Sequence, residues 1–343
     1  MPPQVPVAMR AVQFDRYGEA DVLEVRTIPV PGPGRDEVLV RVHASGINPK
    51  DPIVRQGRLR LLTGRRFPRG TGYDFSGEVA ARGARVTDLT HGDRVWGFLD
   101  GFLGGAAADY VAVPRAWLAP MPRRLGWIEG AALPLVGTTA LQGLRDVARL
   151  RSGDRLLIKG ASGGVGSAAI QIAKAMGAQV TALASGEGID HCRALGADAV
   201  VDYRRIAPES LGERFDVFFD CVGRSPYLAY RRLFTRRGRW VSTAPEPKVY
   251  ALAPVSQVLA PVLGGPRLGY VIVKPRRADL EELGRLVERG LLRMPVTAMY
   301  PLEEIRKAHD AAARLHGRGK QVIVVSPEAL AERDAGNEAV ELP

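Results

Sequence analysis

The first third of the chain carries short runs in which apolar and polar positions alternate, a period of two that is typical of half-buried β-strands. β-Branched residues are frequent in these runs, and glycine, proline or aspartate bounds them. The runs lie at residues 10–15, 37–44, 77–81, 94–98 and 110–113. Because helices do not alternate with these strands, we predict a barrel-like β module rather than a parallel sheet.

The pattern changes near Gly130, where alanine and leucine recur at helical spacing over residues 129–150. Beyond that segment, short apolar strands alternate with helical stretches. Strands are predicted at 154–159, 179–184, 199–201, 215–219, 239–242 and 269–273, and helices at 165–176, 188–195 and 279–290. This alternation predicts an α/β fold, a doubly wound parallel sheet with helices on both faces.

The β character returns after Leu291, with strands expected at 295–299 and 321–325 around a helix at 302–315. This piece is too small to fold alone, so we expect it to complete the first β module. An α/β domain is then inserted into a β domain. Residues 1–131 and 291–343 form the β-barrel domain, and residues 132–290 form the α/β domain. The polar and acidic residues after Ser326 are expected to be a tail.

The 343 residues are 46% apolar and 25% charged, which is ordinary for a globular protein. No uncharged apolar run has the form of a membrane helix of roughly 18–20 residues, and the amino-terminus lacks the pattern of a signal peptide. The two cysteines, Cys192 and Cys221, exclude a disulfide framework and a cysteine-based metal cage. We expect a cytoplasmic protein.

The net charge of +11 is unusual, and only seven of the 48 basic residues are lysine. The arginines are scattered, with local clusters at 55–69, 231–239 and 267–277. Two interpretations stay open: the base composition of the coding DNA, or an anionic partner such as a dinucleotide or a nucleic acid. We favour the first, and a nucleic-acid partner is not expected.

A glycine-rich turn follows the predicted strand at 154–159 and opens the predicted helix at 165–176. This is the context of the dinucleotide-binding fingerprint. Residues without a Cβ let the turn approach a pyrophosphate, while the helix N-terminus offers free N–H groups and a positive dipole end. We expect the whole turn to bind the cofactor: Gly160, Ala161, Ser162, Gly163, Gly164, Val165 and Gly166.

The end of the next strand bears on the choice between NADPH and NADH. An NAD site usually places an acidic residue there, whereas Ser185 is neutral and can donate to a phosphate. Tyr203, after the third strand, adds a second hydroxyl. Glu187 favours NADH, but the basic residues His191, Arg204 and Arg205 can offset it. We therefore predict NADPH in preference to NADH.

Two further strand ends carry predictions. Ligands bind at the carboxyl ends of such strands, so Cys221, Val222 and Gly223 after the fourth strand are expected to contact the cofactor. The last strand, near residues 268–273, is apolar and is expected at the sheet edge. Because an unpaired edge strand invites a partner, we predict a homodimer.

Together these features resemble the medium-chain dehydrogenase/reductase superfamily, and specifically its zinc-independent quinone oxidoreductase branch. The resemblance covers residues 9–325 and rests on motifs at 38–51, 72–79, 92–95, 131–140, 160–166, 195–198 and 319–320. It implies a GroES-like β-barrel domain for the first module and a Rossmann domain for the second. It also implies that Lys320 is a cofactor-binding residue.

In the zinc-containing members of the superfamily, a Cys, a His and a Cys hold the metal. The motifs align these positions with Asn48, Tyr73 and, approximately, Leu135. None of the three is a thiolate or an imidazole, the ligands that a catalytic zinc needs. The resemblance therefore implies a site without zinc.

Without a Lewis acid, the protein must stabilise negative charge by hydrogen bonds, which suits conjugated acceptors. The resemblance implies NADPH-dependent hydride transfer to a quinone or an α,β-unsaturated carbonyl, with Asn48, Tyr73 and Thr138 as catalytic residues. Asn48 is either beside nicotinamide and substrate or a simple turn residue. Tyr73 either donates to the substrate oxygen or fills the emptied zinc pocket. The alternative functions are a biosynthetic enoyl reductase and a non-catalytic protein that binds NADPH or RNA.

Overall fold

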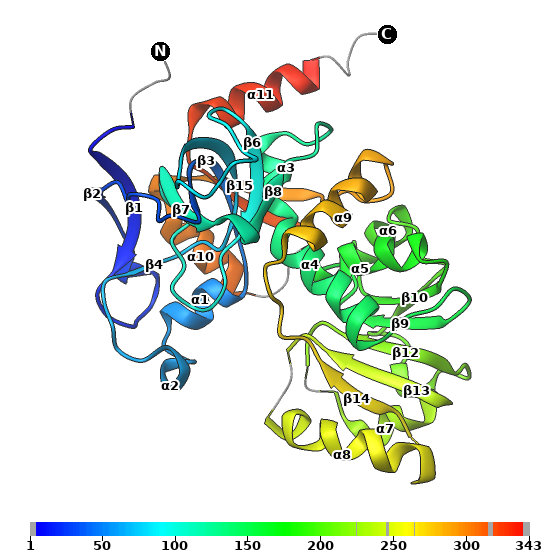
Figure 1. Cartoon of the computed structure of the whole chain (residues 1–343). Coiled ribbons are helices and arrows are strands. Elements are labelled where there is room, and N and C mark those ends of the chain that lie inside the picture. Colours follow the sequence, from blue (N-terminus) through cyan, green and yellow to red (C-terminus); the bar gives the residue numbers. More distant parts are fainter. Residues whose placement is uncertain (1–4, 224, 245–246, 264, 315–317, 339–343) are drawn as a thin grey trace. The chain divides into compact units, whose positions relative to one another are not determined.

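The computed structural model describes residues 5–223, 225–244, 247–263, 265–314 and 318–338 (Figure 1). The chain forms two compact units. Unit 1 contains Met1–Leu135, Lys274–Gly290 and Met294–Pro343, and unit 2 contains Val136–Val273 and Leu291–Arg293. The second unit is thus inserted into the first, as the sequence predicts. Residues 274–290, which the sequence assigns to the α/β domain, group with unit 1 instead.

The described part of unit 2 contains a six-stranded sheet in which every pair of neighbouring strands is parallel. The spatial order is β11-β10-β9-β12-β13-β14. The strands are β9 (Arg155–Lys159), β10 (Gln179–Ala184), β11 (Ala199–Asp202), β12 (Phe215–Asp220), β13 (Phe234–Ser242) and β14 (Arg267–Tyr270). This is the strand order of a Rossmann fold, which confirms the predicted fold class.

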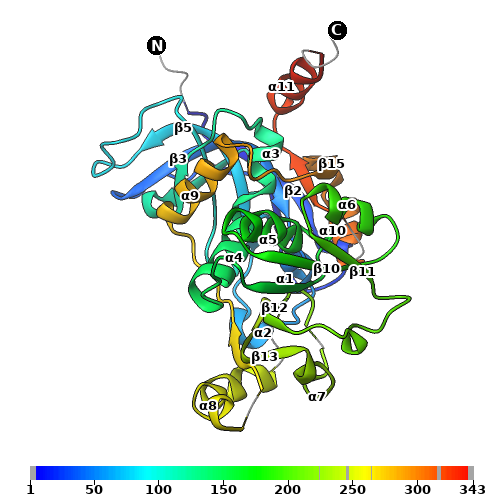
Figure 2. The same ribbon diagram turned by 90° about the vertical axis from the view of Figure 1, so that its right-hand side faces the viewer.

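Helices cover both faces of this sheet (Figures 1 and 2). On one face, Phe218, Trp240 and Leu268 pack in one core cluster with Tyr230 and Ala253. The latter two belong to α7 (Tyr227–Tyr230) and α8 (Pro247–Leu263). The opposite face is covered by α4 (Pro134–Gln142), the π-helical turn at Gly143–Val147 and α5 (Gly164–Ala175). The short helix α6 (Gly188–Ala194) packs beside β10 and β11.

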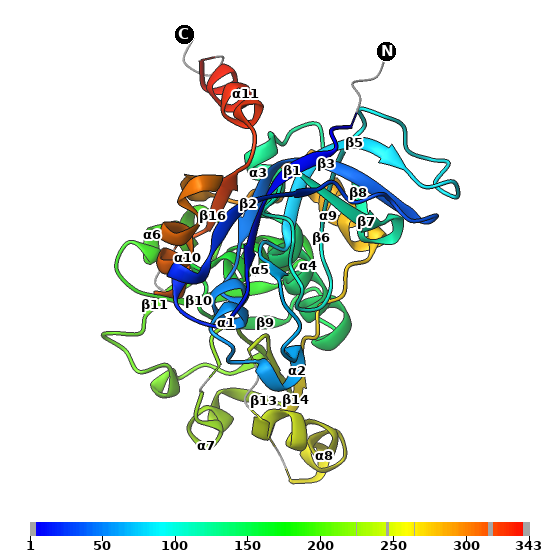
Figure 3. The same ribbon diagram turned by 90° about the vertical axis from the view of Figure 1, so that its left-hand side faces the viewer.

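The strands of unit 1 form two sheets among its described residues. A small antiparallel sheet has the order β2-β1-β4, and Figure 3 shows β1 and β2 side by side. A seven-stranded sheet has the order β15-β16-β3-β5-β6-β8, with β7 paired to β3. The strands are β1 (Ala8–Phe14), β2 (Glu24–Pro29), β3 (Glu37–Ile47), β4 (Arg69–Gly70), β5 (Asp74–Arg82), β6 (Arg94–Phe98), β7 (Tyr110–Pro114), β8 (Leu118–Pro120), β15 (Val296–Pro301) and β16 (Lys320–Val324).

The late strands complete the first module, as predicted, because β16 pairs with β3 in antiparallel register, Gln321 opposite Ile47. The helices of unit 1 lie around these sheets. They are α1 (Lys50–Arg55), α2 (Arg60–Thr63), α3 (Trp127–Ala132), α9 (Arg277–Glu288), α10 (Ile305–Ala313) and α11 (Pro327–Glu338).

Short 3-10 turns occur in both units, at Ala20–Val22, Arg115–Trp117, Pro208–Ser210, Arg231–Leu233 and Leu302–Glu304. No helix in the described ranges combines the length and the apolar character that a bilayer crossing requires.

Two segments differ from the sequence-based expectation, and the segment of α8, for which the sequence analysis made no prediction, is helical despite its prolines. The single helix expected over 129–150 is divided into α3, α4 and a π-helical turn, because Pro134 begins a new helix. The expected tail after Ser326 contains the helix α11. Its Glu332 carboxylate pairs with Arg94 at 2.8 Å and accepts a hydrogen bond from the Trp127 N–H at 2.9 Å.

Candidate active site

The glycine turn of unit 2 needs glycine at its two ends for reasons internal to the fold. Gly160 has φ +73, and a Cβ added there would lie 2.7 Å from Val222 Cγ2. A Cβ on Gly166 would lie 2.3 Å from the Gly160 carbonyl oxygen. Both distances are shorter than a normal contact. Gly160 therefore permits the close approach of the turn after β12, and Gly166 permits the close approach of α5 to the end of β9.

Gly163 differs from the glycines at the ends of the turn. Its φ is −73, and the nearest atom to an added Cβ is the Gly160 oxygen at 3.5 Å. The fold therefore has room for a side chain here, in front of the first N–H groups of α5. An open glycine at a helix N-terminus is the cradle that a pyrophosphate requires, so the turn fits a dinucleotide. Ser162, Gly163, Gly164 and Val165 are half-buried, whereas Ala161 and Gly166 are buried.

Two hydroxyl groups meet where β10 and β11 end. Ser185 Oγ lies 3.0 Å from the Tyr203 hydroxyl, and the Tyr203 side chain is 49% exposed. Arg204 and Glu187 are exposed in the same region. His191 instead contacts α5, with its Nε2 atom 2.8 Å from Ser167 Oγ. The structure thus brings the predicted pair Ser185 and Tyr203 together.

The turn after β12 is shaped by Asp220. Its Oδ1 atom accepts hydrogen bonds from the N–H groups of Val222 at 3.0 Å and Gly223 at 2.8 Å. Gly223 has φ +77, a left-handed conformation that glycine adopts without cost. Burial, together with the neighbouring Asp220, raises the pKa of the Cys221 thiol, so the thiol is neutral at pH 7.

Lys159 connects this turn to the glycine turn, a link that the sequence analysis missed. It is the last residue of β9 and immediately precedes Gly160. Its ammonium donates to the Gly223 carbonyl at 2.9 Å and to Ser225 Oγ at 2.7 Å. Ser225 in turn donates to Asp220 at 2.8 Å. A lysine at the end of a strand gives no sequence signal that distinguishes it from an ordinary surface lysine.

Thr138 lies within α4 of unit 2 and is fully buried. Its Oγ1 atom has no hydrogen-bond partner among the residues that the structure describes. A hydroxyl left in this state costs about 1–3 kcal/mol, and a bound ligand that accepts its hydrogen bond recovers that cost. This observation fits the predicted role of Thr138 at the nicotinamide.

In unit 1 the side chain of Asn48 is held on both sides. Its Oδ1 atom accepts a hydrogen bond from Lys320 Nζ at 2.6 Å, and its Nδ2 group donates to Asp74 Oδ2 at 2.7 Å. Lys320 Nζ also donates to the Ile47 carbonyl at 2.8 Å and lies 3.5 Å from Asp74 Oδ2. The Lys320 and Asp74 side chains are 4% and 0% exposed.

The electrostatics of this cluster follow from its burial. Burial lowers the pKa of Lys320, and the carboxylates of Asp74 and Asp51 raise it again. Burial also raises the pKa of Asp74, which Lys320 and the amide of Asn48 lower in turn. The second oxygen of Asp74 accepts the Leu135 N–H at 2.5 Å. We call Lys320, Asp74 and Asn48 the buried clamp.

Asp51 holds the backbone around Asn48 in place by accepting hydrogen bonds. Its carboxylate accepts the N–H of Asn48 at 2.9 Å, the N–H of Gly72 at 2.8 Å and the hydroxyl of Thr71 at 2.7 Å. Thr71 Oγ1 also lies 3.1 Å from His309 Nε2. Burial lowers the pKa of His309 to about 3, so this imidazole is neutral.

Tyr73 is 1% exposed and lies beneath Lys50, whose ammonium is 4.0 Å from the ring centre. Burial, followed by the charge of Asp51, raises the pKa of the Tyr73 phenol. The hydroxyl is therefore a hydrogen-bond donor at neutral pH. Lys50 also lies 4.9 Å from the Phe102 ring and donates to the Gly101 carbonyl. The sequence analysis did not assign Lys50 or Phe102 to the site.

At the positions where the sequence resemblance implies zinc ligands in metal-containing relatives, this chain has an amide, a phenol and an aliphatic side chain: Asn48, Tyr73 and Leu135. Zinc prefers thiolate and imidazole ligands, so this set does not fit the metal. Across the described ranges, no group of three or more His, Cys, Asp or Glu side chains is placed to hold a metal ion.

The predicted site residues thus fall into two groups. Unit 1 carries Asn48, Tyr73 and Lys320, and unit 2 carries Thr138, the glycine turn, the Ser185–Tyr203 pair and the Cys221–Gly223 turn. Within unit 1 the structure joins Asn48 directly to Lys320. Since the three donors of the Lys320 ammonium are directed at protein acceptors, its contact with the cofactor stays a prediction.

Known proteins are similar to this chain over most of its length. Residues 34–123 match the alcohol dehydrogenase GroES-like domain, and residues 195–323 match the zinc-binding dehydrogenase family. A chloroplast envelope quinone oxidoreductase homolog from Arabidopsis thaliana is 31% identical over 330 residues, covering 93% of this chain and 98% of the relative. An NADPH-dependent alkenal/one oxidoreductase, chloroplastic, from the same plant is 37% identical over 228 residues, covering 64% of this chain and 58% of the relative.

Solved structures are also similar to this chain. The quinone oxidoreductase from Coxiella burnetii superposes with a TM-score of 0.85 at 30% identity, covering 93% of this chain and 100% of that one. The chain belongs to the medium-chain dehydrogenase/reductase superfamily. Within it, the chain belongs to the quinone oxidoreductase-like branch and is an NAD(P)H-dependent oxidoreductase. The predicted family, fold and enzymatic nature are therefore confirmed.

We predict that Gly163→Val weakens NADPH binding at least tenfold without lowering stability. The valine occupies the open space in front of α5, where the phosphate must lie, and no protein atom is within 3.4 Å of its Cβ. Calorimetric titration and thermal unfolding measure the two effects. Gly212→Val is the matched control, because Gly212 lies in unit 2 with open space around it. Unchanged affinity in Gly163→Val would place the phosphate elsewhere.

Proposed function

We propose that this protein uses NADPH to reduce a quinone or an α,β-unsaturated carbonyl compound without zinc. The observation that carries the proposal is the buried clamp. At a position where metal-containing relatives place a zinc ligand, this chain places an amide held between an ammonium and a carboxylate. The printed names of the relatives, a quinone oxidoreductase homolog and an alkenal/one oxidoreductase, support the substrate class.

Conjugated acceptors suit such a site because the charge created by reduction spreads over the acceptor. A bound NADPH would supply the hydride for the enone or the quinone, and a proton from water would complete the reduction. The protein then has to orient the acceptor and stabilise a partly charged oxygen by hydrogen bonds. Tyr73 has a phenol that remains protonated at pH 7, because burial raises its pKa. We assign it as the donor to that oxygen.

Asn48 has a positioning role in this scheme. Both polar atoms of its amide are engaged, so the side chain is fixed in one orientation. One N–H of the amide is directed at Asp74, and the other makes only a long contact, 3.4 Å, with the Gly46 carbonyl, which a carbonyl of the nicotinamide or the substrate can replace. Fixing a donor before the substrate arrives lowers the reorganisation needed in the transition state.

The preference for NADPH rests on the Ser185–Tyr203 pair. Neither residue carries the carboxylate that usually binds the two ribose hydroxyls of NADH. Two adjacent hydroxyls can donate to a 2′-phosphate instead, and exposed Arg204 lies one residue beyond Tyr203. The name of the NADPH-dependent relative supports the same cofactor.

We further propose that the enzyme is a homodimer in the cytoplasm. β14 is the terminal strand of the sheet, so one of its edges lacks a partner among the described strands. Ile272, just beyond β14, is an apolar side chain that is 61% exposed. Both cysteines are free thiols, which suits a reducing compartment.

The cofactor and metal are tested together on the purified protein. We expect tighter binding of NADPH than of NADH by calorimetric titration, and less than stoichiometric zinc by elemental analysis. Ser185→Asp should weaken NADPH binding about tenfold or more, because it places a carboxylate beside the 2′-phosphate. Ser210→Asp, an exposed serine of unit 2, is the matched control and should leave both affinities unchanged. Stoichiometric zinc or a preference for NADH would contradict the corresponding part of the proposal.

Steady-state kinetics separates the roles of Asn48 and Tyr73. We expect Asn48→Ala to lower kcat/KM by roughly 1–3 kcal/mol of transition-state stabilisation. Tyr73→Phe should lower kcat while NADPH affinity stays intact. A silent Tyr73→Phe would remove Tyr73 from the catalytic residues and leave it as a space-filling side chain. The substrates compared are quinones, alkenals and an enoyl thioester, and a marked preference for the thioester would favour the biosynthetic alternative.

The dimer is tested by light scattering at micromolar concentration. We expect the mass of two chains for the wild type and a shift toward monomer for Ile272→Glu, since a charge would then be buried beside the paired strands. A wild type that is only monomeric would exclude this assembly.

A further inference from the structure

Lys50 is the first residue of α1 and lies over the ring of Tyr73. Its ammonium nitrogen is 4.0 Å from the centre of the Tyr73 ring and 4.9 Å from the centre of the Phe102 ring. The ammonium donates a hydrogen bond to the Gly101 carbonyl, its one hydrogen-bond partner among the residues that the structure describes. Because an ammonium carries three N–H groups, two of them remain for a ligand or for water.

The burial of the two side chains differs. Tyr73 is 1% exposed, whereas Lys50 is half-buried and covers one face of the Tyr73 ring. Lys50 can therefore exchange a proton with water, while the buried phenol cannot do so directly. An acceptor whose oxygen reaches the Tyr73 hydroxyl comes close to the Lys50 ammonium as well.

The surroundings make Lys50 the stronger acid of the two. Burial lowers the pKa of the Lys50 ammonium, and the charge of Lys274 lowers it further. The carboxylates that face the ammonium raise its pKa without cancelling this effect: Asp51, Asp100 and Asp74. Asp100 is itself paired with Lys274 at 2.9 Å. Burial raises the pKa of the Tyr73 phenol, so the phenol donates a hydrogen bond but keeps its proton.

A lysine at this place is unusual for this chain, because only seven of its 48 basic residues are lysine. Arg94 shows the common alternative, since its guanidinium lies over the Trp127 ring at the same distance, 4.0 Å. An arginine supports a cation–π contact equally well but stays protonated at any physiological pH. The lysine over Tyr73 therefore indicates a need for a cation that can release a proton.

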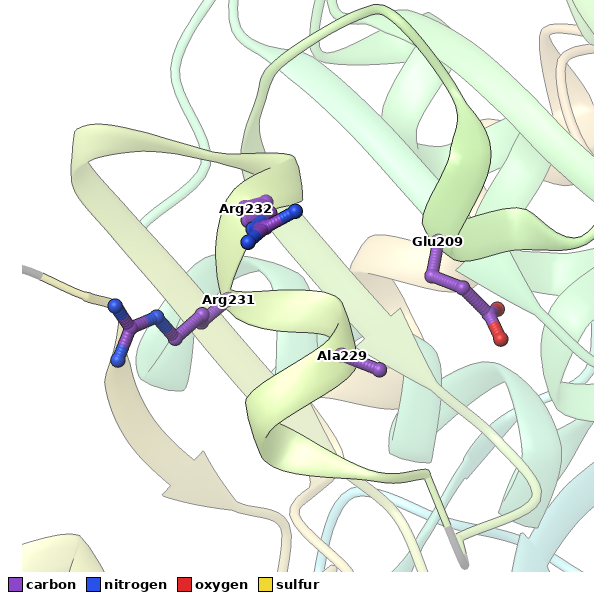
Figure 4. Close-up of a pocket in the computed structure, with 4 residues that line it drawn as sticks. All are labelled: Glu209, Ala229, Arg231 and Arg232. Carbon is purple, nitrogen blue, oxygen red and sulfur yellow. The ribbon is translucent and has the colours of Figure 1, made fainter.

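A pocket in unit 2 illustrates the contrast. It has a volume of about 490 Å³ and is lined by Glu209, Ala229, Arg231 and Arg232 (Figure 4). Its basic side chains are arginines, which attract an anion but do not release a proton at physiological pH. Of these two places, only the one at Tyr73 offers a cation with a transferable proton.

We propose that Lys50 delivers the proton that completes the reduction, an inference that rests on the proposed function. Addition of a hydride to the β-carbon of an enone moves the π electrons to the carbonyl oxygen and leaves an enolate. One N–H bond of Lys50 then breaks, its proton forms an O–H bond with the enolate oxygen, and the electron pair stays on the amine nitrogen. The enol becomes the saturated ketone, and the amine takes a proton from water. With a quinone, the same transfer neutralises the hydroquinone anion.

The first measurement compares Lys50→Arg and Lys50→Met with the wild type between about pH 6 and pH 10. We expect both variants to lower kcat about a hundredfold or more at neutral pH, with NADPH affinity unchanged, because general acid catalysis contributes that much. In the wild type, kcat should fall as rising pH removes the Lys50 proton, and the variants should lack this fall. Lys307→Arg, an exposed lysine of unit 1, is the matched control and should keep the wild-type profile.

The second measurement is independent of activity. The lysines of the cofactor-free protein are reductively methylated with carbon-13 formaldehyde, and their methyl signals are followed by NMR against pH. With seven lysines in the chain, the signal that is absent from Lys50→Arg identifies Lys50. We expect this signal to titrate below about pH 10.4, the ordinary value for lysine.

Two kinetic results and one NMR result would overturn the proposal. A Lys50→Arg variant with wild-type activity would show that positive charge alone suffices. A rise in KM confined to anionic acceptors would assign Lys50 to substrate binding instead. A Lys50 signal that titrates at or above about pH 10.4 would remove its acidity. A wild type that reduces none of the quinones, alkenals or the enoyl thioester would contradict the proposed function itself, whereas the other results concern Lys50 alone.

Discussion

A buried positive charge organises the polar interior of unit 1. Lys320 Nζ lies inside unit 1 with its donors directed at Ile47, Asn48 and Asp74. An ammonium in such a place is tolerated only when it is paired and hydrogen-bonded, since the desolvation of an unpaired charge costs several kcal/mol. The ends of β3 and the beginnings of β5 and β16 must therefore stay together. In our account, this constraint fixes the amide of Asn48 where metal-containing relatives hold zinc.

The two units supply different kinds of precision. In unit 2 the backbone shapes the candidate cofactor site. Gly160 and Gly166 allow neighbouring backbone segments to approach closely, and Gly163 leaves space in front of α5. Asp220 and Lys159 hold the turn after β12 by hydrogen bonds. In unit 1 the candidate site is instead shaped by side chains, chiefly the buried carboxylates of Asp74 and Asp51. The first arrangement suits an anionic cofactor that needs N–H donors, and the second suits a small oxygen atom that gains charge during reaction.

The sequence was a good guide to the fold and a partial guide to the site. The alternation of strands and helices predicted the Rossmann sheet, and the return of β character after Leu291 predicted that β16 completes the first module. Local patterns did not reveal α8, whose prolines argue against a helix, or α11, whose contacts to Arg94 and Trp127 are distant in sequence.

The misses at the site have one cause. The partners of Asn48 are 26 and 272 residues away, so no spacing rule connects Asn48, Asp74 and Lys320. Lys159 was missed for the same reason, because only the parallel pairing of β9 with β12 brings it to the Gly223 carbonyl, 64 residues away. Asn48, Tyr73 and Thr138 came from the family motif, and their catalytic roles stay predictions.

The most direct test of the clamp is a double-mutant cycle on kcat/KM between Lys320→Met and Asn48→Ala. Thermal unfolding confirms that all four proteins are folded under the assay conditions. If Lys320 acts by holding Asn48, each single substitution lowers kcat/KM, and the double variant is about as active as Asn48→Ala alone. If the two losses add in free energy, Lys320 acts independently of Asn48, and the account of the buried clamp is wrong.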